Sequence, residues 1–269
     1  MGGGYVYVSD QYHYRIVKFD LAGQFVTEWG SQGSGPGQFG QTIGLSLDGH
    51  GRLYVVDLTN NRIQVFTTEG AFVREWGSQG SGPGQFSEAR RVLVDPAGIV
   101  HVTDFGNNRI QTFDSDGALV SVWAVDEVYG PAAITIGPDG VFYVAEENGH
   151  HVAMFNSAHD LIGRFGNAGF ADGELAGPTG VAVEASGNVW VTSHLSNRVD
   201  QFTPSGTFIQ TLGSAGTGLG QFNDPADVAV GDLGEIYVVD LGNDRIQVFK
   251  EQPTAALRAT WGQLKARYR

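Results

Sequence analysis

The stretch LYVVDLTNNRIQVF, residues 53–66, decides the fold because it is the clearest copy of a unit that recurs along the chain. Alternating apolar residues on both sides of the turn-forming residues Thr59, Asn60 and Asn61 indicate two short β-strands joined by a tight loop. Close copies occupy residues 100–113 and 236–249. Weaker copies occupy residues 6–19, 142–155 and 189–202, and the closing phenylalanines of the six copies are 47, 47, 42, 47 and 47 residues apart. This regular spacing indicates a repeat architecture.

Each unit is expected to hold four strands. GLSLDGHGRLYVVD predicts one hairpin, and RIQVFTTEGAFVREWG predicts a second whose turn contains Gly70. Four strands in about 47 residues, repeated six times, favour an all-β six-bladed propeller of four-stranded antiparallel blades, a single domain over residues 1–269. A solenoid would need a shorter unit with fewer strands.

The first unit begins at its second strand, YVYVSD. Three strands there and four in each of the other five units give 23, so a closed ring needs one more. The tail LKARY, residues 264–268, alternates apolar and basic residues and is expected to supply it. The alternatives are a truncated native chain and a three-stranded first blade.

These residues carry a family resemblance. The units resemble NHL repeats, whose pattern is a yVtDtgNnRiqvF core followed by a glycine-rich segment that ends in pGqF. SQGSGPGQF occurs here at residues 31–39 and again at 78–86. The resemblance covers essentially the whole chain and implies a propeller scaffold.

Composition narrows the classes of function. The chain has no cysteine, which excludes disulfides, thiol nucleophiles and cysteine metal sites. Its formal net charge of −13 disfavours nucleic acids and anionic membranes as partners. No apolar run is long enough to span a membrane, and residues 1–8 do not resemble a signal peptide. A soluble, monomeric protein is expected, and the compartment stays undecided.

An acidic and a basic residue stand five positions apart in four of the units. Because a site normally occurs once per chain, residues that recur in four blades are expected to hold the blade together. Units four and five depart from the rule, with Glu146 and His151 in one and Ser193 and Arg198 in the other. The expected structural residues are Asp10, Arg15, Asp57, Arg62, Asp104, Arg109, Arg198, Asp240 and Arg245.

The opening of the chain also resembles the propeller of peptidyl-hydroxyglycine amidating lyases, and Tyr12 matches a tyrosine of that family. The lyases hold zinc with histidines, one of them in a Pro-His pair before an innermost strand. The corresponding residues here are Thr42 and Ile43, Ala89 and Arg90, Pro131 and Ala132, Pro178 and Thr179, and Pro225 and Ala226. The resemblance therefore concerns the scaffold, and inherited zinc lyase chemistry is not expected.

A ligand site is expected at the channel mouth, where some units differ from their siblings. Unit three has SEARRV before its innermost strand, and unit four has EENGHH together with a connecting loop five residues shorter than the others. Solvated polar loops of a degenerate blade are the alternative interpretation. The candidate ligand-binding residues are Tyr12, Glu88, Arg90, Arg91, Glu146, His150, His151, His194 and Asp227.

Two classes of function compete. The first is a binding or protein-interaction scaffold that takes a small molecule, peptide or glycan at the channel mouth. The second is a metal-dependent hydrolase or lyase of lactonase, phosphotriesterase or amidating-lyase type, with calcium or zinc held by residues among Glu146, His150, His151, His194 and Asp227. RNA binding, known among NHL domains, is not expected of so acidic a chain. The sequence leaves open whether the protein is an enzyme.

Overall fold

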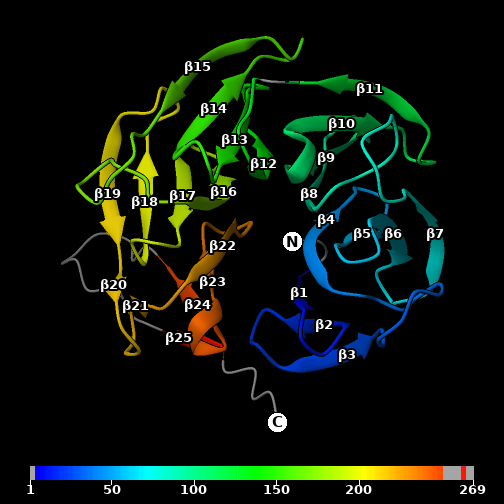
Figure 1. Ribbon diagram of the computed structural model, residues 1–269. Helices are drawn as coiled ribbons and strands as arrows, with labels where there is room; N and C mark the ends of the chain where they lie inside the picture. The colour runs from blue at the N-terminus through cyan, green and yellow to red at the C-terminus, as the bar shows by residue number, and fades with distance from the viewer. Residues whose placement is uncertain (1–3, 126, 251–261, 265–269) are drawn as a thin grey trace. The chain divides into compact units, whose positions relative to one another are not determined.

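The computed structural model describes residues 4–125, 127–250 and 262–264 (Figure 1). The chain divides by internal contacts into two compact units, Met1–Ile134 and Thr135–Arg269. The described residues form strands, turns and two short 3-10 segments, with no α-helix among them. The fold is a six-bladed propeller of mostly four-stranded antiparallel blades, which confirms the prediction from the repeats.

Blades one to three belong to the first unit. Blade one has three strands, β1 (Tyr5–Asp10), β2 (Arg15–Asp20) and β3 (Phe25–Trp29). Blade two contains β4 (Thr42–Leu47), β5 (Arg52–Asp57), β6 (Arg62–Thr67) and β7 (Phe72–Trp76). Blade three contains β8 (Ala89–Val94), β9 (Val100–Asp104), β10 (Arg109–Phe113) and β11 (Leu119–Trp123), with the 3-10 segment η1 (Phe105–Asn107) between β9 and β10.

Blade four starts at the boundary between the units and contains β12 (Pro131–Ile136), β13 (Phe142–Glu146), β14 (His151–Phe155) and β15 (Leu161–Phe165). Blade five contains β16 (Pro178–Val183), β17 (Val189–Ser193), β18 (Arg198–Phe202) and β19 (Phe208–Leu212). Blade six contains β22 (Pro225–Val230), β23 (Ile236–Asp240), β24 (Arg245–Phe249) and β25 (Gly262–Leu264), with η2 (Leu241–Asn243) after β23. The short strands β20 (Ser214–Ala215) and β21 (Gln221–Phe222) pair in parallel in the loop before blade six.

The hydrophobic core lies between neighbouring blades. Tyr54 and Val65 of blade two pack in one buried cluster with Val102 and Phe113 of blade three. A second cluster joins blades one and two, and a third joins blades five and six. The second and third strands of blade two, β5 and β6, are buried along nearly their whole length because this blade packs against a neighbour on each face.

The C-terminal tail gives a partial answer to the question of the missing strand. Leu264, the first residue of LKARY, pairs with Ile246 as the last residue of β25, so it belongs to the outer strand of blade six. The remaining letters of LKARY lie outside the described residues. In the part of the chain that is described, blade one keeps three strands.

The described helical segments include none that is long and apolar enough to cross a membrane.

Candidate ligand-binding loops

Blades two to six each have two kinds of loop at the same end. The loop between the second and third strands is called the inner loop, and the loop that leads into the innermost strand is called the incoming loop. Backbone hydrogen bonds join the two in several blades, for example from the Leu58 N–H to the Gln41 carbonyl at 2.9 Å and from the Gly242 N–H to the Asn223 carbonyl at 2.8 Å. Residues of both loops therefore lie at the same end of their blade, and the surface that these loops form is called the loop face.

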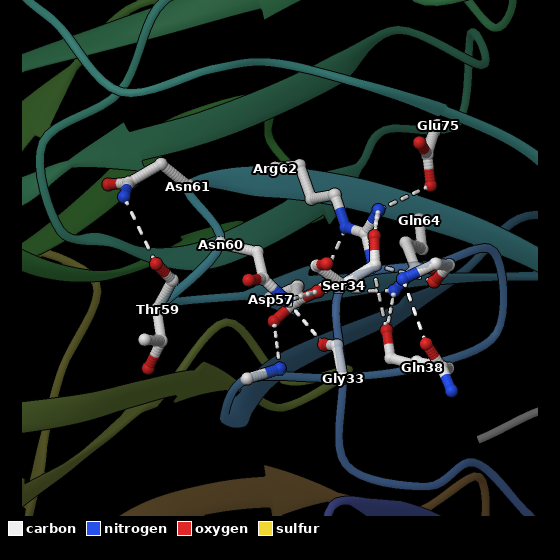
Figure 2. A network of polar contacts seen from close by, with 12 residues as sticks. Gly33, Ser34, Gln38, Asp57, Thr59, Asn60, Asn61, Arg62, Gln64 and Glu75 are labelled. Atoms are coloured by element: carbon white, nitrogen blue, oxygen red, sulfur yellow. Dashed lines mark hydrogen bonds and ion pairs between the residues drawn. The ribbon is translucent and has the colours of Figure 1, made fainter.

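In blade two, Asp57 is the centre of a buried network (Figure 2). One carboxylate oxygen accepts the backbone N–H of Gly40 at 2.8 Å. The other accepts hydrogen bonds from Asn60 at 2.9 Å, from Arg62 at 2.9 Å and from Gln64 at 3.2 Å. A buried carboxylate is stable only when its oxygens are satisfied in this way.

Arg62 extends this network to the incoming loop. Its guanidinium donates to the carbonyls of Ser34 at 2.7 Å and of Gly35 and Gln38 at 2.9 Å. It also contacts Glu75 of β7 at 2.8 Å. The inner loop thus holds the incoming loop of the same blade, and we call this network the clamp.

The clamp recurs in other blades. Arg109 lies 2.7 Å from Asp104 in blade three, and Arg245 lies 2.6 Å from Asp240 in blade six; each arginine also donates to carbonyls of its incoming loop. In blade one Arg15 lies 2.9 Å from Asp10.

Blade five keeps the clamp, but its acidic residue stands at a different position. Ser193 occupies the usual aspartate position, and Arg198 instead contacts Asp200, two residues along the same strand, at 2.9 Å. Arg198 still donates to the carbonyls of Phe170 and Glu174 in the incoming loop, at 2.6 and 2.7 Å. Burial raises the pKa of Asp200, against the lowering effect of its hydrogen bonds from Thr211 and Arg198.

Sequence reasoning missed Asp200, although a signal was present. Residues Gln64, Gln111 and Gln247 occupy this position in blades two, three and six. An acidic residue there, in the one unit with serine in place of the usual acid, indicates a compensating exchange.

Blade four has different residues at the clamp positions. Glu146 is buried, and its Oε2 lies 2.8 Å from Nε2 of His151, at an angle that does not form a regular hydrogen bond. Nδ1 of His151 donates to the Gly149 carbonyl at 2.6 Å. Arg164 of β15 lies 3.6 Å from the other oxygen of Glu146. Both ring nitrogens of His151 therefore face oxygen atoms of its own blade.

The second unit gathers two other candidate histidines around Gly177. The backbone N–H of Gly177 donates to Nδ1 of His150 at 3.0 Å. The ring of His194 lies against the same glycine, where an added Cβ would stand 2.7 Å from Cδ2 and Nε2. Nδ1 of His194 lies 3.2 Å from Asp224, and its Nε2 lies 3.9 Å from Glu147. This cluster combines inner loops of blades four and five with incoming loops of blades five and six.

In the first unit, Arg90 and Arg91 stand in a bulge of β8. Neighbouring residues pair regularly with β9, while the two arginines together face Thr103. The Arg91 N–H donates to the Thr103 hydroxyl at 2.8 Å, and the guanidinium carbon of Arg90 lies 3.4 Å from the centroid of the Phe105 ring. β-bulges commonly redirect side chains next to functional sites.

The remaining candidates lie at related positions. Asp227 follows the corresponding bulge in β22, and its carboxylate accepts the N–H of Val228 at 2.8 Å. Glu88 is exposed with φ +56°, and Asp224 has φ +55° at the same position of blade six. Tyr12, on the inner loop of blade one, is 66% exposed.

The candidate metal ligands do not form a metal centre. Within the described ranges, no group of three or more histidine, aspartate or glutamate side chains is placed to hold a metal ion. The Nδ1 atom of His150 and both ring nitrogens of His151 are directed at protein atoms. The geometry therefore gives no support to a metal held by these residues.

Comparison with known proteins agrees with this architecture. A family model described as a 6-bladed beta-propeller matches residues 41–134, and the NHL repeat model matches residues 222–249. The chain is an NHL-repeat six-bladed β-propeller. No curated protein matches it.

Solved structures resemble this propeller at low sequence identity, so the likeness concerns fold alone. A catalytically inactive virginiamycin B lyase from Staphylococcus aureus with quinupristin has a TM-score of 0.69 and 18% identity, over 99% of this chain and 83% of that chain. A nidogen/laminin complex has a TM-score of 0.71 and 16% identity, over 91% of this chain and 89% of that chain. An auxiliary nutrient binding protein from Bacteroides thetaiotaomicron has a TM-score of 0.68 and 13% identity, over 91% of this chain and 65% of that chain.

Proposed function

We propose that this propeller is a ligand-binding or protein-interaction scaffold, and that the inner and incoming loops form its binding face. In blade three this face takes a ligand that carries a carboxylate group. The observation that carries the proposal is the bulge of β8, in which two successive arginines, Arg90 and Arg91, stand opposite Thr103.

The environment of Arg90 suits recognition of a carboxylate. Stacking on Phe105 occupies a flat face of the guanidinium, whose N–H donors lie in the plane of the group. An arginine held in this way loses less side-chain entropy on binding, and its fork of donors matches the two oxygens of a carboxylate. The aromatic ring also offers an apolar surface for the rest of the ligand.

Comparison between blades shows that this arrangement is special to blade three. The two bulge positions hold Ile43 and Gly44 in blade two, and Thr179 and Gly180 in blade five. Two adjacent arginines therefore stand where blades two and five carry uncharged residues and blade six carries Ala226 and Asp227, in a chain whose net charge is −13. A local basic pair in an acidic protein favours selective binding of an acidic group over general attraction of anions.

Two of the solved relatives support a binding role. One is nidogen in complex with laminin, and another is a nutrient binding protein. The virginiamycin B lyase shows that an enzyme can have this fold too. The alternative for this chain, a metal-dependent hydrolase or lyase, has less support because its candidate ligands form no metal-holding group among the described residues.

An array experiment tests the proposal. Labelled protein is applied to peptides with free or amidated C-termini and to glycans with or without uronic and sialic acids. Ligands that bind are then titrated by calorimetry against the wild type and Arg90→Ala/Arg91→Ala. We expect carboxylate-bearing ligands only, and at least a tenfold weaker affinity in the double variant, since a charge-assisted hydrogen bond contributes about 1.5 to 3 kcal/mol.

Arg74→Ala is the matched control, because Arg74 is also a partly exposed arginine in the first unit but lies on β7 and contacts Asp116. It should bind like the wild type. Equal binding of neutral and acidic ligands, or unchanged affinity in the double variant, would contradict the proposal.

A further inference from the structure

Neighbouring blades are joined by a recurring contact of the inner loop. The last residue of this loop has a left-handed backbone in every blade, and asparagine tolerates that conformation better than most residues. In blade three the Asn108 side-chain oxygen accepts the backbone N–H of Gly130 at 2.8 Å, and in blade five Asn197 accepts that of Asp224 at 2.7 Å. The six left-handed residues are Tyr14, Asn61, Asn108, His150, Asn197 and Asp244.

Blade four has His150 at this position, with φ +57°. Its Nδ1 accepts the backbone N–H of Gly177 at 3.0 Å, which is the same contact with an imidazole in place of an amide. A backbone N–H can only donate, so Nδ1 must carry no proton and a neutral His150 has its proton on Nε2. We call this contact the His150 latch.

The exchange of asparagine for histidine changes how the contact responds to pH. An amide oxygen accepts a hydrogen bond throughout the physiological range. Histidine becomes a donor at both nitrogens when it is protonated, which typically happens near pH 6.5. We propose that the His150 latch is an acid-sensitive joint between blades four and five, and that it opens when Nδ1 takes a proton.

The charged groups around the latch act on it together. Protonation of His194, which packs against Gly177, adds charge to its contacts with Asp224 and Glu147. Acidification therefore removes the contact from blade four to Gly177 and strengthens the contact from blade five to blade six. The titratable and charged groups near the latch are Glu146, Glu147, His151, Arg164, His194 and Asp224.

The latch holds the end of the incoming loop of blade five, residues 166–177. Its opening would loosen this loop at Gly177 while leaving the Arg198 contacts at Phe170 and Glu174 in place. The loop lies on the face to which we assign ligand binding, but the latch can be tested without any ligand.

Hydrogen–deuterium exchange measured by mass spectrometry tests the proposal. Exchange of peptides covering residues 166–177 is followed at pH 7.5 and 5.5 with EDTA present, and corrected for the intrinsic pH dependence of amide exchange. The wild type should lose protection at Gly177 by about five- to tenfold on acidification, the factor expected for one hydrogen bond. In His150→Asn, which restores the residue of the sibling blades, protection should not change with pH.

Two further variants locate the effect. Asn197→His should transfer the pH dependence to the loop before blade six, because Asn197 makes the equivalent contact with Asp224. Blades two and six have leucine at the position of His194. The variant His194→Leu should therefore keep the wild-type pH dependence of exchange at Gly177. The same pH response in the wild type and His150→Asn would overturn the proposal.

A second readout covers the case in which His150→Asn does not fold. Nitrogen-15 NMR of the wild type distinguishes protonated from unprotonated ring nitrogens. Nδ1 of His150 should be unprotonated at pH 7.5, and its protonation should coincide with a shift of the Gly177 amide resonance. A protonated Nδ1 at pH 7.5, or a Gly177 amide that does not respond, would contradict the latch.

Discussion

The indole ring of Trp76, at the end of β7 in blade two, lies directly against Gly117 in the turn between β10 and β11 of blade three. A Cβ added at Gly117 would stand 2.7 Å from Cδ2 and Cε3 of the ring. Trp29 and Gly70 repeat this relationship between blades one and two. An aromatic residue that closes one blade thus needs a glycine in the next.

Gly117→Ala should destabilise the protein by more than the backbone strain at this position would cause. The residue has φ +86°, where a side chain costs about 1 to 2 kcal/mol, and the clash with Trp76 should add about 1 to 3 kcal/mol of overpacking. Gly98 is a matched control, since it has φ +82° in a similar turn and no atom within 4 Å of an added Cβ. Urea unfolding of both variants checks the difference, and equal losses would contradict the packing argument.

Asp57→Ala should remove the centre of the clamp in blade two. Arg62 would keep its carbonyl partners but lose its buried counter-charge, and breaking a buried ion pair typically costs about 3 to 5 kcal/mol. The control is Glu75→Ala, which removes the more exposed partner of the same arginine and should cost about 0 to 1 kcal/mol. Thermal and urea unfolding of the two variants distinguish these cases, and similar losses would argue against a structural role for Asp57.

His151→Ala should lower stability, even though its position in EENGHH suggests a ligand-binding residue. Both ring nitrogens face oxygen atoms of blade four, and the buried Glu146 would lose its contact with Nε2 of His151, at a cost of about 1 to 3 kcal/mol. His194→Ala removes longer and more exposed contacts and should change stability by less than about 1 kcal/mol. If unfolding shows His151→Ala to be as stable as the wild type, His151 returns to the list of binding candidates.

Asp200 should give the protein a measurable pH dependence of stability. Burial raises its pKa in the folded state, so folding favours the protonated form. The stabilising effect is fully present below the ordinary value of 3.8 and is lost as pH rises through the higher folded value. The stability of the wild type relative to Asp200→Asn should therefore fall as pH rises from about 3.8, and a difference that grows with pH in denaturant titrations would contradict this.

Much of the fold could be predicted because repetition makes each blade a check on the others. The spacing of Phe66 and Phe113 and the alternation of the strands were sufficient for blades, strands and turns. The tail was harder to place, because a short alternating segment can pair with any open strand edge. Only the structure shows that Leu264 pairs with Ile246.

The candidate site was less predictable for a physical reason. Sequence spacing says which residues share a loop, but the backbone conformation decides where each side chain points. His150 and His151 are adjacent, yet the left-handed backbone at His150 directs it to Gly177 while His151 faces Glu146. Asp200 replaces the acid at Ser193 because residues two apart on a strand share a face, which a rule counting five positions does not detect.

The clamp also has a consequence for how such proteins change in evolution. In blade two it joins the inner loop to the incoming loop that directly precedes the blade, so residues 30–76 contain both the clamp and the loop it holds. A gene duplication or recombination event that copies this segment carries its own loop attachment with it. A propeller built from such segments can therefore gain, lose or diversify blades one at a time, as the exchanged charges of blades four and five illustrate.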